Sequence, residues 1–88
     1  MTVKEIKELD SIKGQYSDIE VYRNYNSDKM GFHTDRIQSV ESYSEAEEVT
    51  EYQLMDEEDY NNSICANTSL SFSDLYNPEE KILIIKIK

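Results

Sequence analysis

The last eight residues, 81–88, constrain the fold more than any other stretch of the chain. Residues 82–85 (Ile-Leu-Ile-Ile) form the longest apolar run, and the sequence then alternates between lysine and isoleucine to the end. A β-branched run that is apolar on both faces is typical of a strand in the interior of a sheet. We therefore predict a central strand at 81–88. The run is too short for a membrane span, which needs about 20 apolar residues.

An N-terminal helix is the second clear element. Thr2 and Glu5 have capping-box spacing, in which the hydroxyl accepts an orphan backbone N–H and the glutamate reaches back to the cap. Gly14 can take the left-handed conformation that ends a helix. The apolar residues that recur on one face are Val3, Ile6, Leu9 and Ile12. We expect this face to pack over one side of the sheet.

Two further strands are indicated between residues 18 and 43. In 18–25, Ile19 and Val21 share one face while Glu20 and Tyr22 share the other. Part of 30–43 forms the second strand, where Gly31 indicates a bulge or a bend. The remaining local expectations are turns at 26–28 and 77–80 and a short strand at 70–72.

Residues 44–60 fit two structures. Ser44 and Glu47 have capping-box spacing, which favours a helix. The same segment can pair as a strand over 48–55, and we favour the strand. A short helix should follow from Asp56 to Ile64, because Asp56 is a good N-cap and the acids after it suit the helix dipole.

Together these elements predict an α+β fold. We expect a single small domain over 1–88, in which the N-terminal helix packs on a three- to four-stranded antiparallel or mixed sheet. A chain of 88 residues hides about 60–65% of its extended surface. That size leaves no room for two ordinary domains or a large enzyme core.

The acidic charge is concentrated in one segment. The chain carries 19 acids and 9 bases, for a net charge of −10. Residues 37–80 hold twelve acids and no base, whereas 81–88 hold three lysines and no acid. Repulsion within 37–80 must be relieved by bases elsewhere in the fold, by cations or by a partner. A partly mobile segment and a solvated face that maintains solubility are the alternative readings.

The sequence contains no constellation that fixes a catalytic or metal-binding activity. Calcium loops starting at Asp56 or Asp59 lack the glycine and the final carboxylate that the loop requires. One histidine, His33, and one cysteine, Cys65, cannot supply four zinc ligands, and nothing places them together for nucleophilic catalysis. We therefore expect a protein that is not an enzyme and that uses no metal or cofactor.

Binding to a basic surface is the function that the charge pattern favours. Carboxylates without bases can occupy a groove that holds phosphates, although such a chain does not bind nucleic acid directly. Tyrosines interleaved with the acids are candidate anchors, and core packing is their alternative role. The predicted contact residues are Glu45, Glu47, Glu48, Glu51, Tyr52, Asp56, Glu57, Glu58, Asp59 and Tyr60.

Two stretches resemble known proteins. Residues 2–6 leading into 18–22 resemble the helix–strand start of small acidic proteins carried by phages and mobile elements of low-GC bacteria. The cluster at 56–61 (Asp-Glu-Glu-Asp-Tyr-Asn) is similar to acidic-plus-tyrosine stretches in DNA-mimicking anti-CRISPR proteins. The resemblance implies an inhibitor that blocks the basic DNA-reading cleft of a host-defence nuclease, such as a CRISPR effector.

We therefore expect a non-enzymatic inhibitor that occludes a basic, nucleic-acid-binding surface in the cytoplasm of a bacterial host, without a membrane partner. The alternative is a structural or accessory protein of a phage or mobile element. Such a protein would self-associate or join a complex through its sheet edge and tyrosine faces.

Overall fold

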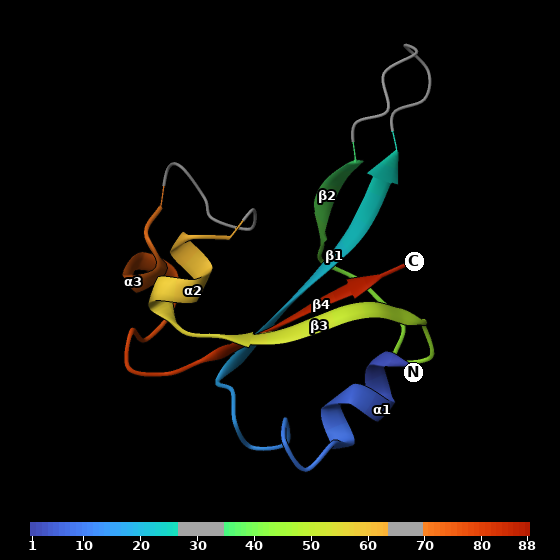
Figure 1. The fold of residues 1–88 in the computed structure, drawn as a ribbon, viewed down its shortest axis with the longest axis horizontal. Helices are drawn as coiled ribbons and strands as arrows, with labels where there is room; N and C mark the ends of the chain where they lie inside the picture. The colour runs from blue at the N-terminus through green and yellow to red at the C-terminus, as the bar shows by residue number, and fades with distance from the viewer. Residues whose placement is uncertain (27–34, 64–69) are drawn as a thin grey trace.

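The computed structural model describes residues 1–26, 35–63 and 70–88. They form an α+β fold with one mixed four-stranded sheet (Figure 1). The elements in chain order are α1 (Val3–Glu8), β1 (Asp18–Asn26), β2 (Asp35–Val40), β3 (Val49–Met55), α2 (Glu57–Asn61), α3 (Phe72–Leu75) and β4 (Ile82–Ile87). No helix in the described part is long and apolar enough to cross a membrane.

The C-terminal run forms the interior strand that its composition predicts. The sheet order is β2-β1-β4-β3, so β4 lies between β1, to which it is parallel, and β3, to which it is antiparallel. The strand β2 is antiparallel to β1. Five of the six residues of β4 are buried, and each buried aliphatic side chain contributes about 1.5–3 kcal/mol of hydrophobic stabilisation.

Helices cover both faces of the sheet. On one face, α1 packs against the strands and shares a core cluster made of Val3, Ile6, Ile12, Val21, Leu83, Ile85 and Ile87. On the other face, α2 and α3 cover one end of the sheet (Figure 1). Their cluster contains Tyr22, Met55, Tyr60, Phe72, Ile82 and Ile84. The alternation of Val21 and Tyr22 between these clusters confirms the predicted faces of β1.

The capping box of α1 is confirmed, but the predicted end of the helix is wrong. The Glu5 carboxylate accepts the Thr2 N–H at 2.9 Å, and the Thr2 hydroxyl accepts the Glu5 N–H. The helix stops at Glu8, where an extended Leu9 follows. Gly14 has φ +75°, as expected, but it lies in a later turn. Leaving the helix early lets the chain fold back and bury Ile12.

The other local expectations have mixed outcomes. The strand predicted over 48–55 is confirmed as Val49–Met55. The helix capped by Asp56 is confirmed, but it ends at Asn61 and not at the predicted Ile64. Residues 44–47 form a turn rather than a helix. The predicted strand at 70–72 is wrong, because Ser71 and Asp74 form a capping box that starts α3 and buries Phe72. The expectation for Gly31 lies outside the described residues.

Candidate functional site

The predicted contact acids separate into two groups in the fold. The first group, the paired acids, lies at and before the start of β3, and each member forms an ion pair with a cation from another segment. The pairs are Glu45 with Lys7 at 2.9 Å, Glu47 with Arg23 at 2.6 Å, Glu48 with the N-terminal amine at 3.3 Å and Glu51 with Lys86 at 3.0 Å. Bases elsewhere in the fold therefore relieve this half of the acidic segment.

Backbone contacts hold the paired acids against α1. The N–H groups of Val3 and Lys4 donate to the carbonyls of Glu47 and Glu45, both at 3.0 Å. They are among the N–H groups that a helix start leaves without intrahelical acceptors. The Lys7 ammonium also lies 5.4 Å from the centre of the Tyr43 ring. The loop at 45–47 therefore has a structural role, because it holds the start of α1 in place.

The pKa values of the Lys7–Glu45 pair reflect this contact. The hydrogen bond from Lys7 lowers the pKa of the Glu45 carboxyl below its ordinary value. Partial burial alone would lower the pKa of Lys7, but Glu45 and Tyr43 outweigh burial and raise it. Both shifts favour the charged forms, so the pair stays ionised at neutral pH.

The second group of acids lies in a segment that has no lysine or arginine of its own and ends directly before Lys81. We call it the acidic end, and it lies where α2, α3 and the loop before β4 meet. Residues 52–80 contain seven acids and no lysine or arginine. These acids are Asp56, Glu57, Glu58, Asp59, Asp74, Glu79 and Glu80, of which all but the half-buried Glu57 are exposed. No ion pair between them and a base occurs in the described residues.

Helix capping places several of these carboxylates. Asp56 caps α2 and accepts the Asp59 N–H at 2.8 Å. Asp74 accepts the Ser71 N–H at 3.0 Å at the start of α3, and this hydrogen bond lowers the pKa of the Asp74 carboxyl. Negative charge at a helix start is favourable because it opposes the positive end of the helix dipole. Local structure therefore stabilises acids that have no ion-pair partner.

A tyrosine cluster fixes the acidic end to the sheet. The Glu20 carboxylate on β1 accepts hydroxyl hydrogen bonds from Tyr76 at 2.6 Å, Tyr22 at 2.7 Å and Tyr60 at 3.3 Å. Phe72 packs between the helices, with ring centres 5.4 Å from Tyr60 and 5.3 Å from Tyr76. Burial, together with the Glu20 carboxylate, raises the pKa of Tyr76 well above its ordinary value of 10.0.

Tyr60 is therefore not a surface anchor. Its side chain is 2% exposed and belongs to the core cluster under α2 and α3. The spacing from Asp56 explains this placement, because residue 60 lies one helical turn after the cap and faces inward, while residues 58 and 59 face solvent. The sequence prediction of a surface contact is wrong for this residue.

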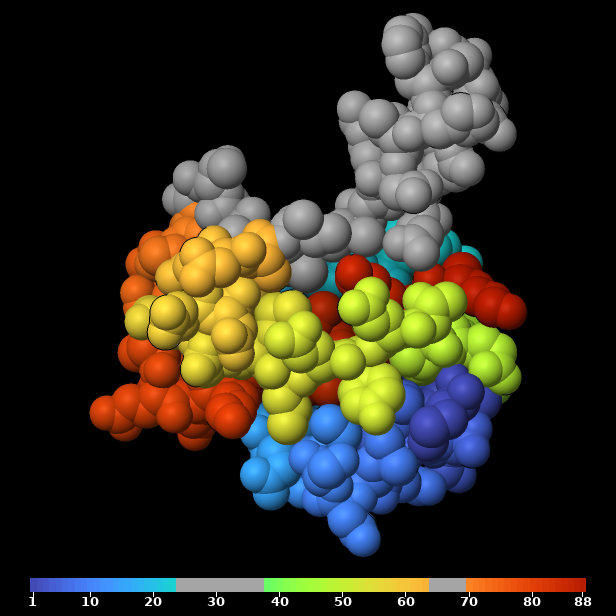
Figure 2. Space-filling view, viewed as in Figure 1, coloured from blue at the N-terminus to red at the C-terminus, as the bar shows by residue number. Residues whose placement is uncertain are grey.

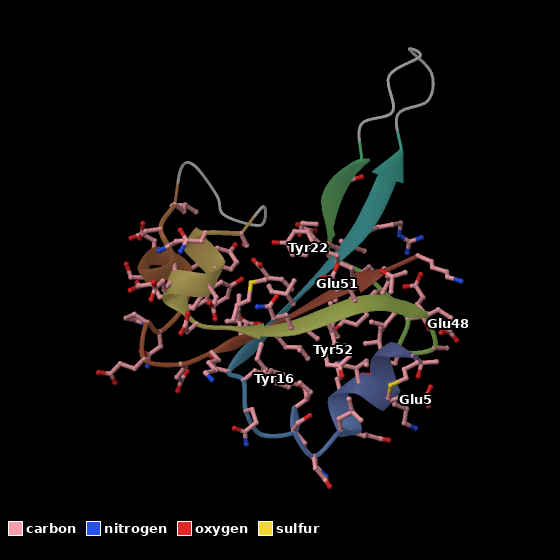
Figure 3. The ribbon with its side chains drawn as sticks, in the orientation of Figure 1. Glu5, Tyr16, Tyr22, Glu48, Glu51 and Tyr52 are labelled. Carbon is pink, nitrogen blue, oxygen red and sulfur yellow. The ribbon has the colours of Figure 1, made fainter. Side chains whose placement is uncertain are left out.

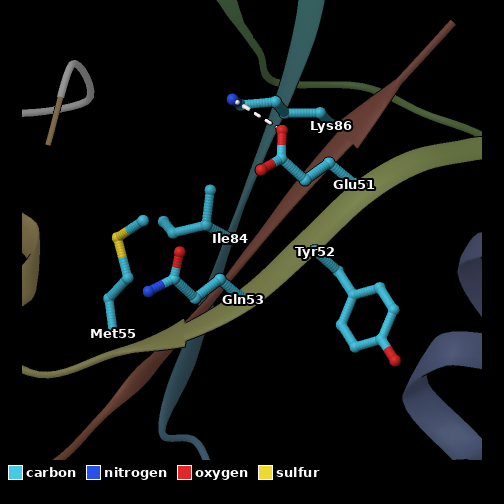
Figure 4. Close-up of a pocket in the computed structure, with 6 residues that line it drawn as sticks. All are labelled: Glu51, Tyr52, Gln53, Met55, Ile84 and Lys86. Carbon is cyan, nitrogen blue, oxygen red and sulfur yellow. Dashed lines mark hydrogen bonds and ion pairs between the residues drawn. The ribbon is translucent and has the colours of Figure 1, made fainter.

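Tyr52 lies apart from the acidic end. It is 41% exposed on β3, on the α1 side of the sheet together with Tyr16, whereas Glu51 and Tyr22 lie on the opposite side (Figure 3). On the opposite side of β3, Gln53, Met55 and Ile84 line a small hollow, and the Tyr52 side chain points away from it (Figure 4). Tyr52 stays a predicted contact, but at a second surface.

The described residues contain no group of three or more His, Cys, Asp or Glu side chains that could hold a metal ion. His33 and Cys65 lie outside the described residues.

Sequence reasoning missed four acids that the fold makes important. Asp74, Glu79 and Glu80 were overlooked because they lie outside the two dense acidic clusters. The absence of any base over 52–80 is the signal that could have included them. For Glu20 the sequence holds only a weak indication of its role. It lies two residues before Tyr22, so the two side chains share one face of the predicted strand. No family model, curated protein or solved structure matches this chain.

Proposed function

We propose that this chain is a non-enzymatic binding protein that occludes a basic, nucleic-acid-binding surface of a partner through its acidic end. One observation carries the proposal: the fold pairs Glu45, Glu47, Glu48 and Glu51 with its own cations, and within the described residues the seven acids of the acidic end have no such partner. Unpaired carboxylates keep their full attraction for an external basic surface.

The acidic end also has features of a protein interface. Leu70 and Leu75 are 44% and 39% exposed beside these acids, so apolar contact can accompany the charge. The capping bonds and the Glu20–tyrosine contacts hold the helices in place before binding. A preorganised surface loses less conformational freedom on association, so more of the interaction energy becomes affinity.

The partner that this surface fits is a protein groove lined with lysine and arginine. Duplex DNA presents about one negative charge per 1.7 Å of its axis, and a groove that holds it attracts any dense array of carboxylates. A host-defence nuclease such as a CRISPR effector is the class of partner that we propose, in the cytoplasm of a bacterial host.

A displacement assay tests the proposal. The chain is immobilised, proteins from a bacterial host extract are bound at low salt and eluted with a salt gradient, and eluted proteins are tested for binding to a short labelled DNA duplex. We expect the chain to displace the duplex. The affinity of the chain for these proteins should fall steeply between about 50 and 200 mM salt, because salt screens exposed charges.

Two triple variants separate the acidic end from net charge. Glu57→Gln, Glu58→Gln and Asp59→Asn remove three of the seven charges of the acidic end and retain the Asp56 cap. Glu8→Gln, Asp10→Asn and Glu41→Gln remove the same charge from exposed positions elsewhere. We expect only the first triple variant to lose displacement. Equal losses in both would contradict the proposed surface.

Self-association through the sheet edge is the second candidate function. The position of β3 at the edge of the described sheet and the exposure of Tyr52 favour it. The net charge of −10 opposes it, because two copies repel each other. It predicts oligomers that persist at high salt, which light scattering would detect.

A further inference from the structure

The strand β3 has one unpaired side. Within the sheet it pairs with β4 only, so about half of its backbone N–H and C=O groups face away from the sheet. The N-terminal segment covers its start, where the Val49 N–H donates to the Met1 carbonyl at 2.7 Å and Thr2 bridges to Glu48. Beyond Val49, no other described segment forms backbone hydrogen bonds with this side.

This open edge is accessible and lacks the usual protection. Residues 50–53 are all exposed, and the residues of β3, coloured yellow-green, lie at the front of the molecule (Figure 2). Natural edge strands are usually protected by charged side chains, above all lysine, by proline or by a bulge, and Glu51 is the one charged side chain within 50–54. The segment 50–54 contains neither lysine nor proline, and the bulge lies at its beginning, between Val49 and Glu51.

The side chains next to the open edge suit a cationic side chain. The hollow of about 30 Å³ has an apolar floor that includes Ile84 and Met55, and it borders Gln53 (Figure 4). Glu51 uses one carboxylate oxygen for Lys86 and is 65% exposed, so its other oxygen can accept a further donor. A lysine or arginine stem can cover apolar surface while its charged end reaches a carboxylate.

We propose that the open edge of β3 accepts an extended segment of the partner protein, rich in lysine or arginine, as a fifth strand. This inference rests on the proposed function and names how the same partner is held. Strand addition supplies affinity through main-chain hydrogen bonds and specificity through alternate side chains. Charge selects the occupant, since the acids at 56–59 follow β3 directly and a second copy of a chain with charge −10 is repelled.

Two synthetic peptides test the strand addition. One alternates lysine and valine, and the other has the same sequence with every backbone nitrogen methylated, so it has no N–H group to donate to a strand ladder. Binding is followed by amide hydrogen exchange and by NMR shifts of the full chain. We expect the lysine–valine peptide to bind about tenfold more tightly or better and to slow exchange within 50–54.

A pair of single-charge variants provides the control. Gln53→Lys places a cation at the edge, and Ser11→Lys adds the same charge at an exposed position away from it. We expect Gln53→Lys to lower the affinity for the lysine–valine peptide by about tenfold and Ser11→Lys to have a much smaller effect on it.

Three results would overturn the inference. Equal binding of both peptides, with shifts confined to the acidic end, would show attraction without strand addition and would leave the proposed function intact. Protection of 50–54 without peptide, in a chain of doubled mass, would assign the edge to a second copy. Equal effects of the two lysine variants would remove the edge from the binding surface. Conversely, edge protection by the lysine–valine peptide alongside failed duplex displacement would refute only the proposed function.

Discussion

Removing the Glu20 carboxylate tests the arrangement of the acidic end most directly. It joins β1 to the segment that carries α2 and α3 through the hydroxyls of Tyr76 and Tyr60. Glu20→Gln keeps the side-chain volume and an acceptor oxygen but removes the charge. We expect the variant to fold and to be less stable, with the loss concentrated where the helices meet the sheet.

The magnitude follows from the hydrogen-bond lengths. Tyr76 and Tyr22 donate at 2.6 and 2.7 Å, whereas Tyr60 donates at 3.3 Å and contributes less. A hydrogen bond to a charged group contributes about 1.5–3 kcal/mol, against about 0.5–1.5 kcal/mol for a neutral one. Neutralising Glu20 therefore weakens the two short bonds by about 2 kcal/mol in total. Because Glu20 is only half-buried, we expect the free energy of unfolding to fall by a smaller amount, toward about 1 kcal/mol. For a domain of this size, Tm falls by about 4–8 °C per kcal/mol.

Urea unfolding followed by circular dichroism and tyrosine fluorescence measures the effect, since the chain has no tryptophan. Tyr76→Phe should cost about 1.5 kcal/mol, and the double variant with Glu20→Gln should cost about 0.5–1 kcal/mol less than the sum of the single losses. Tyr16→Phe is the matched control, because Tyr16 packs on the α1 face and its hydroxyl has no hydrogen-bond partner in the described part of the chain. It should change stability by less than about 0.5 kcal/mol.

Additive losses in the double variant would refute the reasoning, because they would show that Glu20 and Tyr76 do not interact in solution. Equal losses for Tyr76→Phe and Tyr16→Phe would do the same. Faster amide exchange in α2 and α3 of Glu20→Gln would separate this contact from a general effect on the sheet.

Two predictions concern pH. Lys7 lowers the pKa of Glu45 below 4.5, so the ion pair stabilises the fold above that pH. The difference in unfolding free energy between wild type and Lys7→Met should therefore shrink as pH falls through the lowered pKa. A difference that stays constant in urea unfolding down to about pH 3 would contradict this. Because the pKa of Tyr76 is raised above 10.0, its contribution is complete below that pH and is lost as pH rises toward the raised value. Wild type should therefore lose stability above pH 10 more steeply than Tyr76→Phe, as measured by unfolding up to about pH 12.

Local patterns predicted most elements because their signals are short-range. The apolar run at 82–85, the Thr2–Glu5 capping box and the Asp56 cap each act within a few residues, and each is present in the fold. The error at 70–72 has the same origin. Three residues resembled a strand, but the Ser71–Asp74 capping pair and the burial of Phe72 favour a helix start.

The candidate site was less predictable because ion pairs depend on distant segments. Glu45 meets Lys7, and Glu51 meets Lys86, across 38 and 35 residues. Nothing in the spacing of the acids distinguishes these paired carboxylates from those at 56–59. Tyr60 shows the same limit, since its burial depends on Phe72 and Glu20 from other parts of the chain.

The sequence by itself determined that β4 is an interior strand. Five of its six side chains are aliphatic and they lie on both faces, so both faces must be covered to remove them from water. It also determined that 37–80 carries all of the excess negative charge. Only the tertiary structure decided which carboxylates are neutralised, because the Coulomb interaction depends on distance in space and not along the chain. The fold brings cations within 4 Å of the acids at 45, 47, 48 and 51, and in the described part of the chain it forms no ion pair with the acids of the acidic end.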